Sequence, residues 1–250
     1  VASSFANYFH GVTEWTLDVS NLSMAYSTSY QVDYAAFVHP TGTTVIDYPI
    51  SFSWGSAMCS VDATTMLIAE NDVSKLTLNS NGTCTQEFLF KLPTIAGNGY
   101  DNFPGSSNLG HQASGDIVYR PSDGSIFITT HYTATAGGSV TRMLLQYNMN
   151  GTLIDQLDVT APVPAYPGIQ LSMVSLFCAG GKIYGHGGSR LFEIQDNPLS
   201  VTQAQVNWAI TTGGDAGSSP ECCDGIVVDP EPTDPCDFSV GDIGPGGGII

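Results

Sequence analysis

A repeated pattern of paired strands constrains this chain more than any other feature of its sequence. Residues 14–31, 74–90, 143–159 and 189–206 each read as an alternating apolar strand, a tight turn and a second strand. Upstream of the last three, residues 57–71, 115–131 and 175–188 each read as two buried strands around a short polar turn. Each joined unit therefore predicts four antiparallel strands over about 40 to 50 residues, which is typical of a β-propeller blade.

Two of the hairpin turns contain the dipeptide Asn-Gly, at Asn81-Gly82 and Asn150-Gly151. This dipeptide favours a type I′ turn, in which both central residues have positive φ. A third turn, at 121–124, has the sequence Pro-Ser-Asp-Gly, in which each residue type favours a tight reversal. We therefore expect regular hairpins with type I′ geometry at the two Asn-Gly positions.

The number of blades and the closure of the ring are less constrained. Long polar segments at 94–112 and 160–170 make the spacing uneven, and the pattern accounts for four or five blades. The hairpin at 14–31 has no strand pair upstream. Either its first strands are missing, or the ring closes by pairing this hairpin with strands near 208–212. A further hairpin predicted at 34–53 is not assigned to a blade.

The composition changes after residue 223. We expect a β-propeller-like domain at 1–223, an acidic Pro-rich linker at 224–237 and the start of a further Gly-rich module at 238–250. Both ends read as the limits of a processed or partly observed polypeptide.

The charge of the chain excludes some classes of partner. Six Lys and Arg against 23 Asp and Glu give a formal net charge of −17, which repels phosphate backbones and anionic membranes. No apolar run reaches the roughly 18 residues that a membrane span needs. We therefore expect neither nucleic-acid binding nor membrane insertion.

The cysteines favour disulfides over metal binding. None of the six has zinc-ligand spacing. Because a bond between the adjacent Cys222 and Cys223 would be strained, we expect one of them to bond Cys236. This favours an oxidising, extracellular location.

Two segments resemble known families. The blade pattern, with GDIVYRPSDGSIF at 115–127 and GDAGSSPECC at 214–223, resembles propeller-like repeats of secreted bacterial surface proteins and marine phage virion proteins. VGDIGPGGGII, at 240–250, resembles the start of a module of large bacterial surface proteins and phage structural proteins. The resemblance implies a modular protein of a cell surface or a virion, and it brings no catalytic residues.

No catalytic centre is predicted. The serine-rich loops do not lead into a helix, as a nucleophile elbow requires, and no histidines have metal-ligand spacing. His131 and His186, near the ends of second strands, are candidates for one rim of the ring. Because propellers host glycosidase sites, paired carboxylates remain an alternative. The candidates are Glu70, Asp72, Asp101 and Asp116.

Loop aromatics are the better candidates for ligand contact. Tyr100, Asp101, Asn102 and Phe103 lie together in one polar loop, and Tyr132 has similar neighbours. Aromatic faces beside amides and carboxylates are suited to sugar recognition. Calcium binding by Asp101 and Asn102, or by 229–237, is an alternative, although no EF-hand spacing supports it.

The sequence therefore predicts a non-enzymatic structural or adhesion module of an extracellular, cell-surface or virion protein. We expect it to act through self-assembly, through other structural proteins or through surface glycans. The alternative is a secreted carbohydrate-binding or carbohydrate-active propeller.

Overall fold

Most of the described part of the chain is β-strand. A computed structural model describes residues 11–18, 23–32, 57–69, 72–93, 110–134, 139–160, 175–187, 190–206 and 220–224. These residues form fourteen strands and one short 3-10 helix, η3 (Pro220–Cys223), with no α-helix among them. The predicted all-β class is confirmed. None of the described segments is a helix long and apolar enough to cross a membrane.

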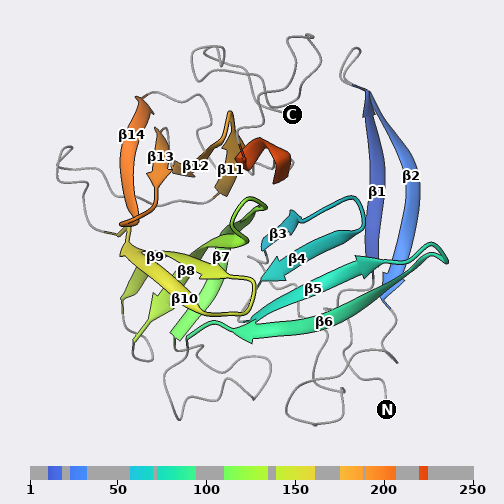
Figure 1. The fold of residues 1–250 in the computed structure, drawn as a ribbon, viewed down its shortest axis with the longest axis horizontal. Coiled ribbons are helices and arrows are strands. Elements are labelled where there is room, and N and C mark those ends of the chain that lie inside the picture. The colour runs from blue at the N-terminus through green and yellow to red at the C-terminus, as the bar shows by residue number, and fades with distance from the viewer. Residues whose placement is uncertain are drawn as a thin grey trace.

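Three units of four antiparallel strands form the body of the fold (Figure 1). We call them the first, second and third sheets. The first contains β3 (Ala57–Ser60), β4 (Thr65–Ala69), β5 (Asp72–Leu78) and β6 (Thr83–Lys91). The second contains β7 (Gly110–Arg120), β8 (Ser125–Thr133), β9 (Val140–Asn148) and β10 (Leu153–Asp158). The third contains β11 (Ser175–Ala179), β12 (Lys182–Gly187), β13 (Arg190–Gln195) and β14 (Ser200–Val206). All three match the four-stranded units predicted from the sequence repeats.

The N-terminal hairpin joins the first sheet. Its strands, β1 (Gly11–Asp18) and β2 (Ser23–Val32), are antiparallel to each other. β2 then pairs in parallel with β6 through Gln31–Thr83 and Val32–Cys84, so the strand order becomes β1-β2-β6-β5-β4-β3. The predicted alternative partner of this hairpin, near 208–212, lies outside the described residues, as does the hairpin predicted at 34–53.

The prediction of type I′ turns at Asn81-Gly82 and Asn150-Gly151 is wrong. Only the glycines have positive φ, 82° in both turns. The Gly82 N–H donates to the carbonyl of Asn79 at 3.0 Å, which closes a type I turn one residue earlier than expected. The Asn81 side chain instead accepts hydrogen bonds from the Thr83 N–H and hydroxyl, at 3.1 and 2.8 Å. Both loops therefore have a type I turn followed by a left-handed glycine.

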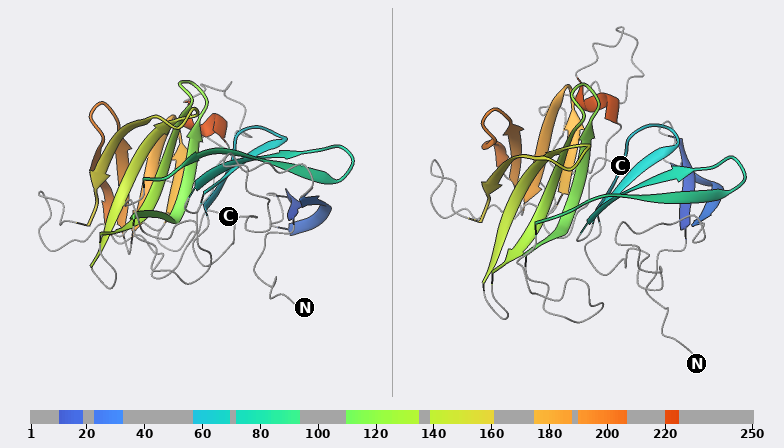
Figure 2. Two further views of the ribbon diagram at one scale, coloured as in Figure 1. Left: turned by 90° about the horizontal axis from the view of Figure 1, so that it is seen from below. Right: turned by 60° about the horizontal axis from the view of Figure 1, so that its bottom comes forward.

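The three sheets lie side by side (Figure 2), and hydrophobic side chains form one core between the first and second sheets and another between the second and third. Leu145 and Tyr147 belong to the core shared by the first and second sheets, whereas Leu144 belongs to the core shared by the second and third. Neighbouring residues of β9 thus point to opposite cores, because strand side chains alternate between the two faces. The second sheet is consequently buried on both sides.

The first strands of the three sheets, β3, β7 and β11, lie next to one another near the centre of the fold. β7 contacts β3 on one side and β11 on the other. The sheets therefore stack in chain order around their first strands (Figure 1).

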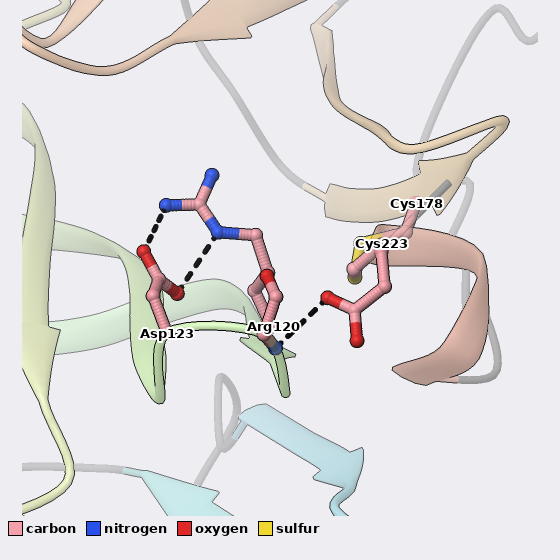
Figure 3. The surroundings of a disulfide bond; sticks show 6 residues. Arg120, Asp123, Cys178 and Cys223 are labelled. Atoms are coloured by element: carbon pink, nitrogen blue, oxygen red, sulfur yellow. Dashed lines mark hydrogen bonds and ion pairs between the residues drawn. A yellow bond between two sulfur atoms is a disulfide. The ribbon is translucent and has the colours of Figure 1, made fainter. Parts of the chain in front are cut away.

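A disulfide fixes η3 to the third sheet (Figure 3). Cys223 bonds Cys178 of β11, with the Cα atoms 4.8 Å apart, and both cysteines are buried in the core between the second and third sheets. Cys222 is also disulfide-bonded. Cys178 was not predicted as the partner of Cys223. Cys236 lies outside the described residues, and so do the predicted linker beyond residue 224 and the module at 238–250.

Candidate functional site

Of the predicted ligand-contact residues, Tyr132 is the one that the structure describes. It lies near the end of β8, where it pairs with His111 of β7 on one side and with Thr141 of β9 on the other. The loop that contains Tyr100, Asp101, Asn102 and Phe103 is outside the described residues, as are both predicted calcium sites. Ligand contact by this loop therefore stays a prediction.

Tyr132 and His111 form a ring pair at this end of the second sheet. Their ring centroids are 4.7 Å apart, with 39° between the planes. The Nδ1 atom of His111 lies 2.9 Å from the Thr130 hydroxyl oxygen. Burial lowers the pKa of His111 to about 4, so the imidazole is neutral at physiological pH. The half-buried Tyr132 ring is thus held by a neutral aromatic neighbour, an arrangement suited to stacking against an uncharged ligand.

The two histidines predicted to face one rim have different surroundings. His131 lies on β8 opposite Arg142 of β9 and is half-buried, and its Nε2 atom has no hydrogen-bond partner. Burial and the nearby Arg142 lower its pKa to about 4. His186 lies near the end of β12, as expected, but it is buried opposite Ser175. Because His186 is closed off from solvent, it does not form part of an exposed rim.

The described candidate carboxylates are occupied by contacts within the fold. Asp116 accepts hydrogen bonds from the N–H groups of Ile117, at 2.8 Å, and of Leu176, at 3.2 Å. The second of these bonds joins β7 to β11. Asp72 is buried on β5 opposite Lys91 of β6, and burial raises its pKa to about 6. The two carboxylates lie on different sheets, and Glu70 and Asp101 are outside the described residues.

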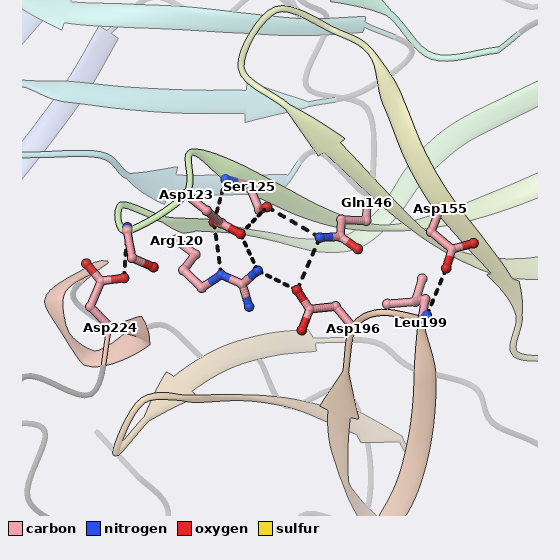
Figure 4. A network of polar contacts seen from close by, with 9 residues as sticks. Arg120, Asp123, Ser125, Gln146, Asp155, Asp196, Leu199 and Asp224 are labelled. Atoms are coloured by element: carbon pink, nitrogen blue, oxygen red, sulfur yellow. Dashed lines mark hydrogen bonds and ion pairs between the residues drawn. The ribbon is translucent and has the colours of Figure 1, made fainter.

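A larger polar cluster, which the sequence analysis missed, lies where the second and third sheets meet (Figure 4). We call it the Arg120 network. The guanidinium of Arg120 contacts Asp123 through Nε and Nη2, at 3.0 and 2.5 Å, and contacts Asp196 through Nη2 at 2.5 Å. Gln146 donates to the Ser125 hydroxyl at 3.3 Å and to Asp196 at 3.5 Å. The network therefore links the β7–β8 turn to the β13–β14 turn.

Electrostatics and packing both hold Arg120 in place. The hydrogen bonds that Arg120 donates to Asp123 and Asp196 raise the pKa of its guanidinium, although burial acts in the opposite direction. Arg120 in turn lowers the pKa of Asp123 through its hydrogen bonds. The guanidinium carbon lies 5.2 Å from the centre of the Phe127 ring, within cation–π range. The pairing of Arg120 with Asp123, three residues along a turn, was the sequence signal available for part of this cluster.

Two further hydrogen bonds cross the same boundary (Figure 4). Asp224, directly after η3, accepts from the Ser122 N–H at 2.9 Å. Asp155 of β10 accepts from the Leu199 N–H at 2.8 Å, in the turn before β14. Together with the Arg120 network and the disulfide, these bonds fasten the third sheet and η3 to the second sheet.

Two cysteines among the described residues are free thiols, and both lie within the first sheet. Cys59 is half-buried, and burial raises the pKa of its thiol well above the usual range. Cys84 is buried, and burial raises its pKa to about 11. Both are therefore protonated at neutral pH and poor nucleophiles. Among the residues that the structure describes, no three His, Cys, Asp or Glu side chains are grouped to hold a metal ion.

Comparison with known proteins assigns the chain to no family. No protein-family model matches it, and no curated protein is significantly similar to it.

Proposed function

We propose that this chain is a non-enzymatic, β-propeller-like module of an extracellular or virion structural protein. It works by assembly and surface binding, through the edges of its sheets and the loops between them. It belongs to a fibre, tail or appendage in which a Pro-rich linker holds successive modules apart.

The main support for this proposal is that the polar groups of the fold link its sheets to one another. Asp116, Arg120, Asp155 and Asp224 each join the second sheet to the third sheet or to η3. Groups that would be candidates for chemistry in an enzyme here stabilise the contact between layers. Such cross-linking suits a module whose duty is to keep its shape.

The cysteines support an extracytoplasmic location. Disulfides form and persist in oxidising environments, and Cys178–Cys223 is buried in a hydrophobic core. Cys59 and Cys84 stay protonated, which limits unwanted oxidation in the same environment. The net charge of −17 adds solubility and disfavours nucleic acids and anionic membranes as partners.

The burial of the two end faces supports a propeller-like ring. On the first sheet, Ile68 and Leu76 point away from the second sheet and are fully buried. On the third sheet, Phe177 and Tyr184 point away from the second sheet, are buried, and stack with their ring centroids 5.5 Å apart. None of the described strands packs across either face. Such faces require further layers, as in a ring of blades.

The test is to examine the purified protein by electron microscopy and with a glycan panel. We expect ordered multimers or glycan binding, with no glycan turnover. Hydrolysis of any glycan, abolished by a carboxylate substitution, would contradict the non-enzymatic proposal. The genes beside the coding gene distinguish the two settings, since capsid or tail genes would favour a virion protein over a bacterial surface protein.

A second candidate function, carbohydrate binding, is favoured by the Tyr132–His111 ring pair. Its test is Tyr132→Ala, with Tyr26→Ala of the exposed hairpin as the matched control. Loss of glycan binding in the first variant alone would support recognition at the end of the second sheet. Equal binding by both variants would exclude it.

A further inference from the structure

The outer edge of the third sheet is suited to accept another strand. Among the described strands, β14 pairs only with β13. Its seven residues, Ser-Val-Thr-Gln-Ala-Gln-Val, include no charged residue, proline or glycine. Thr202 and Ala204 on it are exposed. An uncharged edge strand of this kind presents unpaired backbone groups that act as a template for a further strand.

The outer strands of the other two sheets are protected. β6 is partly covered by β2, which pairs with it at Thr83 and Cys84, and it carries the charged Glu87 and Lys91 further along. β10 carries Asp155 and Asp158, and its pairing with β9 is irregular between Leu153 and Asp155. Charges and bulges are common devices against edge-to-edge association. Of the three outer strands, β14 alone has neither a covering strand nor a charged residue, although its pairing with β13 is also irregular, between Leu191 and Phe192.

The β1–β2 hairpin has the properties of a strand donor. It projects from the first sheet, and most of the described side chains on both strands are exposed, including Met24 at 61% and Tyr26 at 59%. Its pairing to the body is limited to Gln31 and Val32 of β2, and β1 pairs with no described strand other than β2. A two-stranded hairpin with so little burial is marginally stable alone, so added pairing would stabilise it.

Charge favours contact between the hairpin and β14. The hairpin strands contain Glu14 and Asp18 and no basic residue. β14 is neutral and lies beside Arg190 of β13, whose Nη1 donates to the Gln203 side chain at 2.7 Å. Glu193 of β13, opposite Thr202, is already paired with Lys182, so Arg190 makes this neighbourhood favourable for an acidic hairpin.

The geometry places donor and acceptor at opposite ends of one molecule. In Figures 1 and 2, the hairpin lies at one end of the row of sheets and β14 at the other. A hairpin in this position reaches a β14 edge most directly on a neighbouring copy.

We infer that β14 pairs with the β1–β2 hairpin of a second copy of this chain, so that copies associate head to tail. The contact repeats between chains the strand addition that β2 makes to β6 within one chain. Because the two surfaces differ, such association continues into an open filament unless its rotation closes a ring. The inference rests on the proposed structural function and names its partner surface.

The experiment uses two blocked variants of the full chain. Thr202→Lys with Ala204→Lys places charges on the β14 edge, and Thr16→Pro on β1 removes the donor by blocking its edge or opening the hairpin. Gln156→Lys, at an exposed position of β10, is the matched control. Light scattering after size-exclusion chromatography measures the mass of each protein alone and in a 1:1 mixture, and near-ultraviolet circular dichroism verifies folding.

We expect multimers for the wild type and the Gln156→Lys control, monomers for each blocked variant alone, and dimers when the two blocked variants are mixed. The mixture is decisive because each variant retains the surface that the other lacks. Wild-type multimers that persist in both blocked variants would overturn this inference and leave the proposed structural function standing. A wild type that is monomeric at all concentrations would also overturn it, whereas the proposed function is contradicted separately, by glycan turnover.

Discussion

Gly82 and Gly151 form a natural matched pair for testing how the first and second sheets pack. Both have φ of 82° and both end a type I turn with the same hydrogen bonds. A Cβ atom added to Gly82 would have no neighbour within 4 Å, whereas one added to Gly151 would lie 2.5 Å from Cβ of Phe90. Phe90 belongs to the first sheet and stacks on Tyr147 of the second, with ring centroids 4.8 Å apart.

Gly82→Ala should therefore lower the free energy of unfolding by about 1 kcal/mol, the cost of holding alanine in a left-handed backbone conformation. Alanine at Gly151 adds the cost of overpacking, and we expect a total of about 2–4 kcal/mol. Urea unfolding followed by tryptophan fluorescence gives both free energies. Equal destabilisation by Gly82→Ala and Gly151→Ala would refute the packing of Phe90 against the β9–β10 turn.

Three other perturbations have defined outcomes. Replacing Cys178 and Cys223 by Ala opens a loop with a sequence separation of 45. We expect the free energy of unfolding, measured in urea, to fall by about 4 kcal/mol, far more than for Cys59→Ala. Asp196→Ala removes one of the two carboxylates on Arg120 and should cost about 1–2 kcal/mol, whereas Glu193→Ala, which breaks the more exposed pair with Lys182, should cost under about 0.5 kcal/mol. Because the pKa of Asp72 is raised to about 6, its folded form holds a proton more tightly than the unfolded chain, and its contribution to stability falls as pH rises from about 4 to 6. Asp72→Asn should therefore flatten the pH dependence in that window and raise stability at pH 7 by about 2–3 kcal/mol, and an unchanged profile would contradict the burial of this carboxyl.

Sheet formation was predictable because its signals are local. Alternation of apolar residues and the turn residues at 81–82, 121–124 and 150–151 lie within each hairpin, and they determined the strand pairs correctly. The turn type was not predictable from the dipeptide. The Asn81 side chain accepts a hydrogen bond from Thr83, and only the glycine that follows has positive φ. A dipeptide rule does not include that competing hydrogen bond.

Contacts between sheets were not predictable in the same way. Arg120 and Asp196 are 76 residues apart, and Cys178 and Cys223 are 45 apart, so neither pair has a spacing that indicates contact. The burial of His186 likewise follows from the packing of β12 and not from its position near a strand end. The hairpin at 14–31 was recognised, but its junction with β6 depends on an edge that exists only once the first sheet has formed.

The stacking of three sheets, with the second in the middle, is most directly tested by methyl nuclear Overhauser effects from two neighbouring residues of β9. We expect Leu145 methyl groups to give contacts with methyls of the first sheet, such as Val73 and Leu67, and Leu144 methyl groups to give contacts with Leu176 and Ile194 of the third sheet. Contacts from both leucines to the same sheet, or from neither to any other sheet, would contradict the stacked arrangement.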